Sequence, residues 1–258
     1  AAGDITSHRP RAAFVKGVPP DCDEWEHFEH DAGRTSVSED LRAGVPSETV
    51  WIAGEDWPSY LTFTGNRVGF ASALGRNFYW VSDASLQTNK VVHLTSRLMC
   101  RDAYNGLLLW QREFAGPSRP TCMIASSNTL YLETSARELH VIDAASGATL
   151  RSAVEPILAE VMLLSGDVLV AFSRQVRVRA LTNNAANLAW DQTYPAGWIR
   201  TEDGIAADAS NVVFLYKQET SLLMHMTCRD LRSGQERWTA NVDALRPRVG
   251  FDQIPDVG

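Results

Sequence analysis

The feature that most constrains this chain is a recurring segment that ends in tryptophan. Residues 100–110 (CRDAYNGLLLW) and 228–238 (CRDLRSGQERW) carry cysteine, arginine, aspartate, glycine and tryptophan at the same spacing. Residues 141–151 keep the aspartate and the glycine but end in arginine, whereas residues 180–190 keep the tryptophan and lose the other two. The last residues of the four segments, at positions 110, 151, 190 and 238, are therefore 41, 39 and 48 residues apart.

A period of 40 to 50 residues is that of a four-stranded propeller blade. Helical repeats of similar length are excluded because short apolar runs are broken by Asn-Gly and Ser-Gly turns. We therefore predict an all-β fold, a β-propeller of four-stranded antiparallel blades. About four complete blades fit between residues 61 and 238, and residues 50–51 and 248–251 have the pattern of strands from partial blades at each end. The predicted ring is incomplete: it is either a fragment of a propeller with seven or eight blades or a ring that a partner closes.

Each repeated residue type has a chemical reason to be there. An aspartate that ends a strand accepts backbone N–H groups of the following turn. The glycine supplies the positive φ that the turn or an adjoining bulge needs, and the tryptophan is expected to pack between neighbouring blades. The structural repeat residues are Asp102, Gly106, Trp110, Asp143, Gly147, Trp190, Asp230, Gly234 and Trp238.

The chain divides into an N-terminal lead-in or linker, residues 1–46, and the propeller blades, residues 47–258. In the first blade, residues 82–95 form an insertion between strands. Insertions of this kind often line a binding face of a propeller.

Composition excludes several classes of partner. A formal net charge of −7 argues against nucleic acid, whose binding needs a basic surface. No apolar run approaches the ~18 residues of a membrane span.

The N-terminus has neither the basic nor the apolar region of a signal peptide. The four cysteines are spaced like neither a disulfide framework nor a zinc site, so we expect free buried thiols.

The most metal-like group of residues is His27, His30 and Asp31. Imidazoles at i and i+3 can share one face of a helix and bind a divalent ion, which would suit a metal-dependent hydrolase. We interpret the segment instead as a polar structural one and expect no metal site. Residues 36–39 (SVSE) fit a helix capping box and predict a short turn of helix.

No recognised catalytic motif is present. The sequence lacks a nucleophile elbow, a zinc-protease motif, a phosphate-binding loop and a dinucleotide-binding glycine motif. Three histidines lie in or beside expected strands, where we interpret them as structural: His93, His140 and His225.

The spacing of Asp102, Gly106 and Trp110, repeated in residues 228–238, resembles the repeat of PQQ-binding-like β-propellers. That superfamily contains quinoprotein alcohol dehydrogenases and BamB-type outer-membrane assembly factors. Residues 23–33 and 50–54 are similar to the lead-in of large bacterial BamB-like proteins, and the resemblance covers roughly residues 19–240.

The resemblance implies a non-catalytic binding or scaffold module in a periplasmic or other extracytoplasmic bacterial setting. Its partner would be a protein or the remaining blades, and the chain could form an oligomer. Neither a nucleic-acid partner nor a membrane span is expected. The alternative is a PQQ-dependent dehydrogenase-type domain, or a degenerate remnant of one, with PQQ and Ca²⁺. Such enzymes typically hold the quinone with a vicinal Cys-Cys disulfide, and no two cysteines are adjacent here. We therefore expect no cofactor and no catalytic residue.

Overall fold

The computed structural model describes residues 21–27, 29–41, 70–87, 90–114, 120–173, 177–182, 184–194, 197–199, 204–218 and 223–242. Its elements are seventeen strands in four antiparallel sheets, which we call blades A to D. Blade A contains β1 (Phe70–Ala73), β2 (Arg76–Gln87), β3 (Lys90–Asp102) and β4 (Leu108–Phe114). Blade B contains β5 (Pro120–Ser126), β6 (Thr129–Thr134), β7 (Glu138–Asp143) and β8 (Thr149–Val154).

The other two blades follow the same plan. Blade C contains β9 (Val161–Ser165), β10 (Val168–Ser173), β11 (Arg177–Thr182) and β12 (Asn187–Thr193). In blade D the first strand is divided, so that β13 (Gly197–Ile199) and β14 (Ile205–Ala207) both pair with β15 (Asn211–Gln218), which is followed by β16 (Met224–Asp230) and β17 (Glu236–Asn241).

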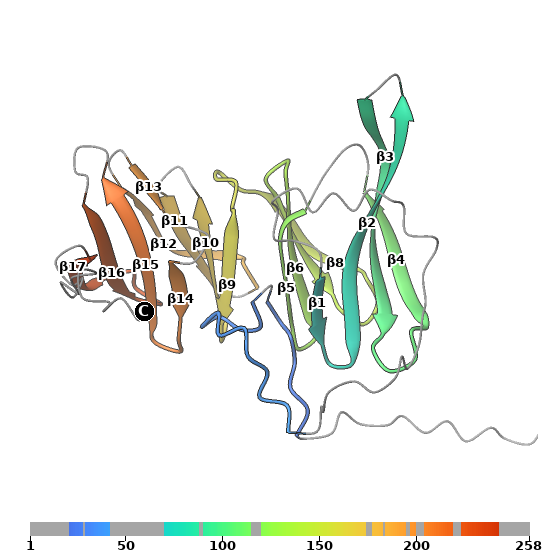
Figure 1. The fold of residues 1–258 in the computed structure, drawn as a ribbon, viewed down its shortest axis with the longest axis horizontal. Coiled ribbons are helices and arrows are strands. Elements are labelled where there is room, and N and C mark those ends of the chain that lie inside the picture. The colour runs from blue at the N-terminus through green and yellow to red at the C-terminus, as the bar shows by residue number, and fades with distance from the viewer. Residues whose placement is uncertain are drawn as a thin grey trace, which may run out of the picture.

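The blades are arranged radially, with their first strands innermost. Strand β5 contacts both β1 and β9, and β9 also contacts β14, whereas β4, β8, β12 and β17 end their sheets on the other side. Figure 1 shows the four sheets standing side by side around this inner row. The predicted all-β propeller of four-stranded antiparallel blades is therefore confirmed. The strands expected at residues 50–51 and 248–251 lie outside the described residues.

The apolar core fills the spaces between successive blades. Each of three buried clusters joins residues of two neighbouring blades. Their largest fully buried members include Phe78 and Leu130 between A and B, Leu139 and Leu169 between B and C, and Phe172 and Phe214 between C and D. Burial of apolar area therefore holds the blades against one another.

In blades A, B and C the outermost strand is hydrogen-bonded to a turn of the next blade. In β4, the indole N–H of Trp110 donates to the carbonyl of Ala144, 3.0 Å away, in blade B. In β12, the indole N–H of Trp190 donates to the carbonyl of Leu231, 2.8 Å away, in blade D. At the tryptophan position of blade B, the guanidinium of Arg151 donates to a carbonyl of the blade C turn.

Trp238 on β17 is 44% exposed, unlike Trp190, which is buried. The described residues form no sheet beyond β17. A tryptophan in this position is buried only where a further blade stands against it.

The aspartates organise the turns that receive these side chains. One carboxylate oxygen of Asp102 accepts the backbone N–H groups of Tyr104 and Asn105, at 2.9 and 3.0 Å. Asp143 and Asp230 bind their own turns in the same manner. A register shift between the third and fourth strands accompanies each turn, as an inserted residue requires.

The insertion expected at residues 82–95 continues β2 and β3 as a two-stranded ribbon. Its pairing runs to Gln87 opposite Lys90, while β1 pairs with β2 only as far as Tyr79. Figure 1 shows this ribbon projecting beyond the blade.

Glycine is required where the turn meets the tryptophan of the preceding blade. Gly234 has φ +69°, and a Cβ at this position would lie 2.6 Å from the Trp190 ring. Gly166 has φ +59° with nothing within 4 Å. We predict that Gly166→Ala lowers the free energy of unfolding by about 1–2 kcal/mol, the cost of the left-handed backbone alone. Gly234→Ala should cost about 1–3 kcal/mol more, because Trp190 must move.

Urea denaturation of the full chain measures both changes, with Gly166→Ala as the matched control. Equal losses in the two variants would mean that Trp190 does not rest on Gly234.

Candidate functional site

The candidate site is the mouth of the central axis, where an N-terminal segment crosses the blades. We call residues 21–27 and 29–41 the strap. Figure 1 shows the strap running beneath the inner strands from blade A toward blade D.

The strap supplies one hydrogen-bond acceptor to the innermost strand of every blade. The carbonyls of Trp25, Glu26 and Ala32 accept the backbone N–H groups of Ser72 (2.8 Å), Ala125 (2.9 Å) and Ala207 (2.8 Å), in blades A, B and D. In blade C the acceptor is a side chain: the Nε2 atom of His27 accepts the N–H of Leu164 at 2.9 Å.

The four amides occupy matching places in the repeat. Each lies at or next to the last residue of its inner strand, just before the turn to the second strand. An innermost strand has one edge without a neighbour in its own sheet, and its N–H groups need partners. The strap therefore satisfies the same edge group in four successive blades.

The strap has an internal structure of its own. One carboxylate oxygen of Asp23 accepts the ring Nε2–H of His30 (2.6 Å), the amide of Glu39 (2.6 Å) and the hydroxyl of Ser38 (3.1 Å). Burial works against the charged form, but the bonds from Glu39 and His30 prevail and lower the pKa of Asp23. The ring of Trp25 packs edge-on against His30, with centroids 5.1 Å apart.

The structure of this segment differs from the helical geometry that the metal alternative and the capping-box pattern would require. His27 and His30 do not share a helical face; they face each other in an antiparallel bridge with two N–H···O bonds of 3.2 Å. Residues 36–39 form no helix turn: the Glu39 amide, which a capping box would direct to the Ser36 hydroxyl, donates to Asp23 instead. A distant acceptor competed successfully with local capping.

The suggested metal ligands are engaged in other contacts. His27 uses Nε2 for Leu164, while the two ring nitrogens of His30 contact Thr35 (3.1 Å) and Asp23. Asp31 accepts the amide and hydroxyl of Thr35, each at 3.1 Å. Within the described residues, no group of three or more His, Cys, Asp or Glu side chains is placed to hold a metal ion.

His27 is held neutral by its surroundings. It is 3% exposed, and burial lowers its pKa to about 4 despite the opposing charge of Asp31. Because Nε2 accepts a hydrogen bond, the proton of the neutral ring sits on Nδ1. That N–H has no hydrogen-bond partner among the described residues.

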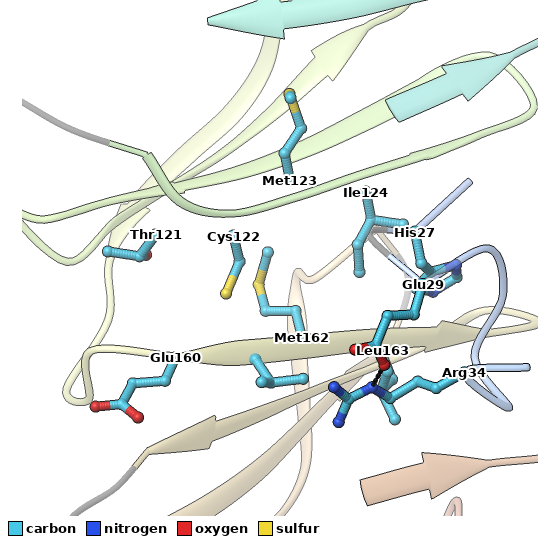
Figure 2. Close-up of a pocket in the computed structure, with 11 residues that line it drawn as sticks. His27, Glu29, Arg34, Thr121, Cys122, Met123, Ile124, Glu160, Met162 and Leu163 are labelled. Carbon is cyan, nitrogen blue, oxygen red and sulfur yellow. Dashed lines mark hydrogen bonds and ion pairs between the residues drawn. The ribbon is translucent and has the colours of Figure 1, made fainter. Parts of the chain in front are cut away.

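Two cavities flank the strap. The smaller, of about 40 Å³, lies between β5 and β9 and has room for a few water molecules. Figure 2 shows its lining, with an ion pair between Arg34 and Glu29 on the strap side. The larger, of about 340 Å³, lies between the strap and blade D and is lined by the same ion pair and by apolar side chains that include Ile205, Leu215 and Met226.

The groups at the mouth suit binding better than catalysis. Cys122, the nucleophile type that lines the smaller cavity, is buried, and desolvation raises the pKa of its thiol well above the usual range. His27 already accepts a backbone N–H, so it cannot take a proton from a substrate without losing Leu164. The described geometry offers backbone hydrogen bonds, apolar walls and a salt bridge.

The remaining predicted residues lie away from the strap. The repeat aspartates and glycines are in the turns between third and fourth strands. His140 is buried with its ring edge-on to Phe114, and His225 stacks on Tyr216. Nothing is described of the side chain of His93. All four cysteines are free, and Cys22 is the one that is not fully buried.

The role of the strap as a connector of blades was not predicted from the sequence. Its only sequence signal was the dense run of Trp, His and Asp between residues 23 and 31, which suggested ligands for a metal. The partners of the strap are backbone amides, which every strand possesses.

The radial four-stranded blades and the tryptophan-to-turn contacts define a β-propeller. The family model described as outer membrane protein assembly factor BamB matches residues 94–257. The chain therefore belongs to the BamB family. A search among curated proteins found no match.

Solved structures with similar folds have low sequence identity. BamB from Moraxella catarrhalis is 13% identical with a TM-score of 0.38, covering 66% of this chain and 72% of that one. A europium-containing methanol dehydrogenase is 12% identical with a TM-score of 0.45, covering 66% and 40%. The Pan2 WD40 domain of Neurospora crassa is 10% identical with a TM-score of 0.43, covering 58% and 48%. The chain thus spans less than half of the dehydrogenase and of the Pan2 domain.

Acid should weaken the strap at His27. The unfolded chain takes up a proton near pH 6.5, whereas the folded chain does so only near pH 4. The stabilisation is complete above pH 6.5 and is lost as the pH falls toward 4. We predict that between pH 7 and pH 5 the parent chain loses about 1–2 kcal/mol more unfolding free energy than His27→Gln.

Urea denaturation at the two pH values gives the comparison. Glu133, whose pKa burial raises to about 7, titrates in the same range with the opposite sign, because its neutral form is the one the fold favours. Glu133 is present in both proteins, so its contribution cancels when their changes in unfolding free energy are compared. An identical pH dependence in parent and variant would contradict the neutral, accepting role of His27.

Proposed function

We propose that this chain is a non-catalytic propeller module that binds other proteins, in an extracytoplasmic bacterial setting. The family match supports the proposal, since the matched model describes an assembly factor of the outer membrane. In the described part of the chain no helix combines the length and apolar character needed to cross a bilayer.

The observation that carries the proposal is an exposed apolar edge on blade A. Three consecutive leucines begin at the turn before β4, and Leu107 is 64%, Leu108 44% and Leu109 47% exposed. Tyr104, in the same turn, is 48% exposed. Strand β4 also ends its sheet, so its outer backbone groups face no strand of blade A. Exposed apolar groups beside an open strand edge favour contact with another protein.

The proposal includes that the module works without a quinone. The cysteines at the repeat positions, Cys100 and Cys228, are on different blades, so they cannot form the vicinal pair that quinoprotein dehydrogenases use. Purified protein incubated with PQQ and Ca²⁺ and then desalted should retain no quinone absorbance. A retained chromophore at one equivalent would favour a dehydrogenase-type domain instead.

The interaction surface can be tested by paired substitutions. We expect the Leu107→Lys, Leu109→Lys double variant to lose most capture of periplasmic or membrane-associated proteins in a cross-linking pull-down from a bacterial envelope fraction. Leu188→Lys is the matched control, because Leu188 is 54% exposed and occupies in blade C the place that Leu108 has in blade A. Exposed substitutions of this kind change stability by about 0.5 kcal/mol or less.

Unfolding curves of the three proteins confirm that they are comparably folded. Capture that is equal in all three, or absent from the parent chain, would count against a protein-binding role for this edge.

A further inference from the structure

The mouth of the central axis has the properties of a peptide site that is already occupied. Its four repeat-equivalent amides, on Ser72, Ala125, Leu164 and Ala207, are all bound by one continuous segment, which turns between His27 and His30. Three of the four acceptors are main-chain carbonyls, so most of the contact depends on the path of the strap backbone rather than on residue type. Recognition through strand-edge N–H groups, with a few side chains for specificity, is how proteins bind extended peptides.

Side chains of the strap supply the specificity. His27 reaches Leu164 with its ring, so this contact depends on residue type. The Trp25 ring packs against His30 within the strap, and His30 in turn pairs with His27 in the antiparallel bridge. These contacts hold the Trp25 and Glu26 carbonyls near the imidazole of His27. The strap therefore presents the carbonyls of Trp25 and Glu26 and the imidazole of His27 to three neighbouring blades.

The strap holds its shape through contacts within itself. The Asp23 carboxylate binds His30, Ser38 and the Glu39 amide, and the His27–His30 bridge closes the turn. A pre-ordered ligand loses less conformational entropy on binding. The strap can thus act as a discrete unit rather than as part of any one blade.

The length of the connection between the strap and blade A allows the strap to come from the same molecule or from a second copy. The strap ends at Leu41 and β1 begins at Phe70, and a connection of that many residues can span up to roughly 90 Å. A chain of that length could reach the axis of its own blades or that of a neighbouring molecule. Exchange of an identical element between copies requires no new complementary surface.

We propose that the mouth of the axis is a peptide-binding surface whose ligand is the strap, and that it accepts the strap of a second copy of this chain. This site is separate from the leucine edge of blade A and does not rest on that edge binding a partner.

The test uses the full chain with a protease recognition sequence inserted between Ala43 and Gly44. After cleavage, a fluorescent synthetic peptide of residues 21–41 should bind the protein at one equivalent, measured by anisotropy. The uncut chain should bind at least about tenfold more weakly, because its tethered strap competes at high effective concentration. A peptide with His27→Ala should bind the cut chain at least about tenfold more weakly, whereas Val37→Ala, at an exposed position, should bind like the parent peptide.

Failure of the labelled peptide to bind the cut, folded chain would overturn the proposal, as would equal binding of the His27→Ala peptide. If the cut chain precipitates, the intact His27→Ala chain takes its place, since it retains the strap but has lost one of the four contacts. The parent peptide should then bind this variant more tightly than it binds the parent chain, and equal binding would again overturn the proposal.

Sedimentation tests the claim that the site accepts the strap of a second copy of this chain. Sedimentation of the uncut chain should show a dimer at high concentration that excess 21–41 peptide converts to monomer. Peptide binding without such a dimer would exclude a second copy as the source of the strap. The Leu107→Lys, Leu109→Lys variant should behave like the parent in all of these measurements, so a failed leucine edge is distinguishable from a failed strap site.

Discussion

A hydrogen bond from the outermost strand of one blade to the turn of the next recurs at every described seam, and the regularity of the fold depends on it. Trp110 and Trp190 make this bond with the indole N–H, and the adjoining ring rests on a glycine that has no Cβ to obstruct it. Arg151 makes the bond with its guanidinium. The two imperfect repeats therefore meet at one seam: blade B lacks the tryptophan and blade C lacks the glycine. An indole needs the space that a glycine leaves, whereas a guanidinium can reach the carbonyl from farther away, so the two departures compensate each other.

The strap solves a different problem, at the other edge of the sheets. Burial between blades draws the sheets together but leaves the inner strands with backbone groups that face the axis. One continuous segment satisfies one such group per blade and so links all four blades, including those that are not neighbours. In blade C it does so through His27, whose ring must stay neutral. His27 thus contributes to the pH dependence of the mouth, together with Asp23, whose pKa is lowered, and Glu26, whose pKa burial raises.

The sequence predicts the parts of this structure that depend on residue type. Asp102, Gly106 and Trp110 each have a side-chain or φ requirement, so their spacing indicated blades, turns and seams. The strap was not predictable in this way, because its partners are amides of strands far along the chain. The i and i+3 spacing of His27 and His30 fits a helix as well as a bridge, and only the tertiary contacts decide between them. The role of Arg151 could not be predicted for a related reason. An arginine at the tryptophan position indicates a degenerate repeat, and its hydrogen bond to the next blade is evident only from the tertiary structure.

The order of the strap in the sequence has a consequence for how the molecule is made. The strap precedes all four blades, yet His27 and Leu164 are separated by 137 residues. During synthesis the strap must wait until blades A to D have formed before its contacts are complete, and contacts of such long range form slowly. In that interval each inner edge is open to any extended chain nearby. A nascent propeller of this kind would be most vulnerable to mispairing along its axis, and least so at its outer seams, which join consecutive blades as they emerge.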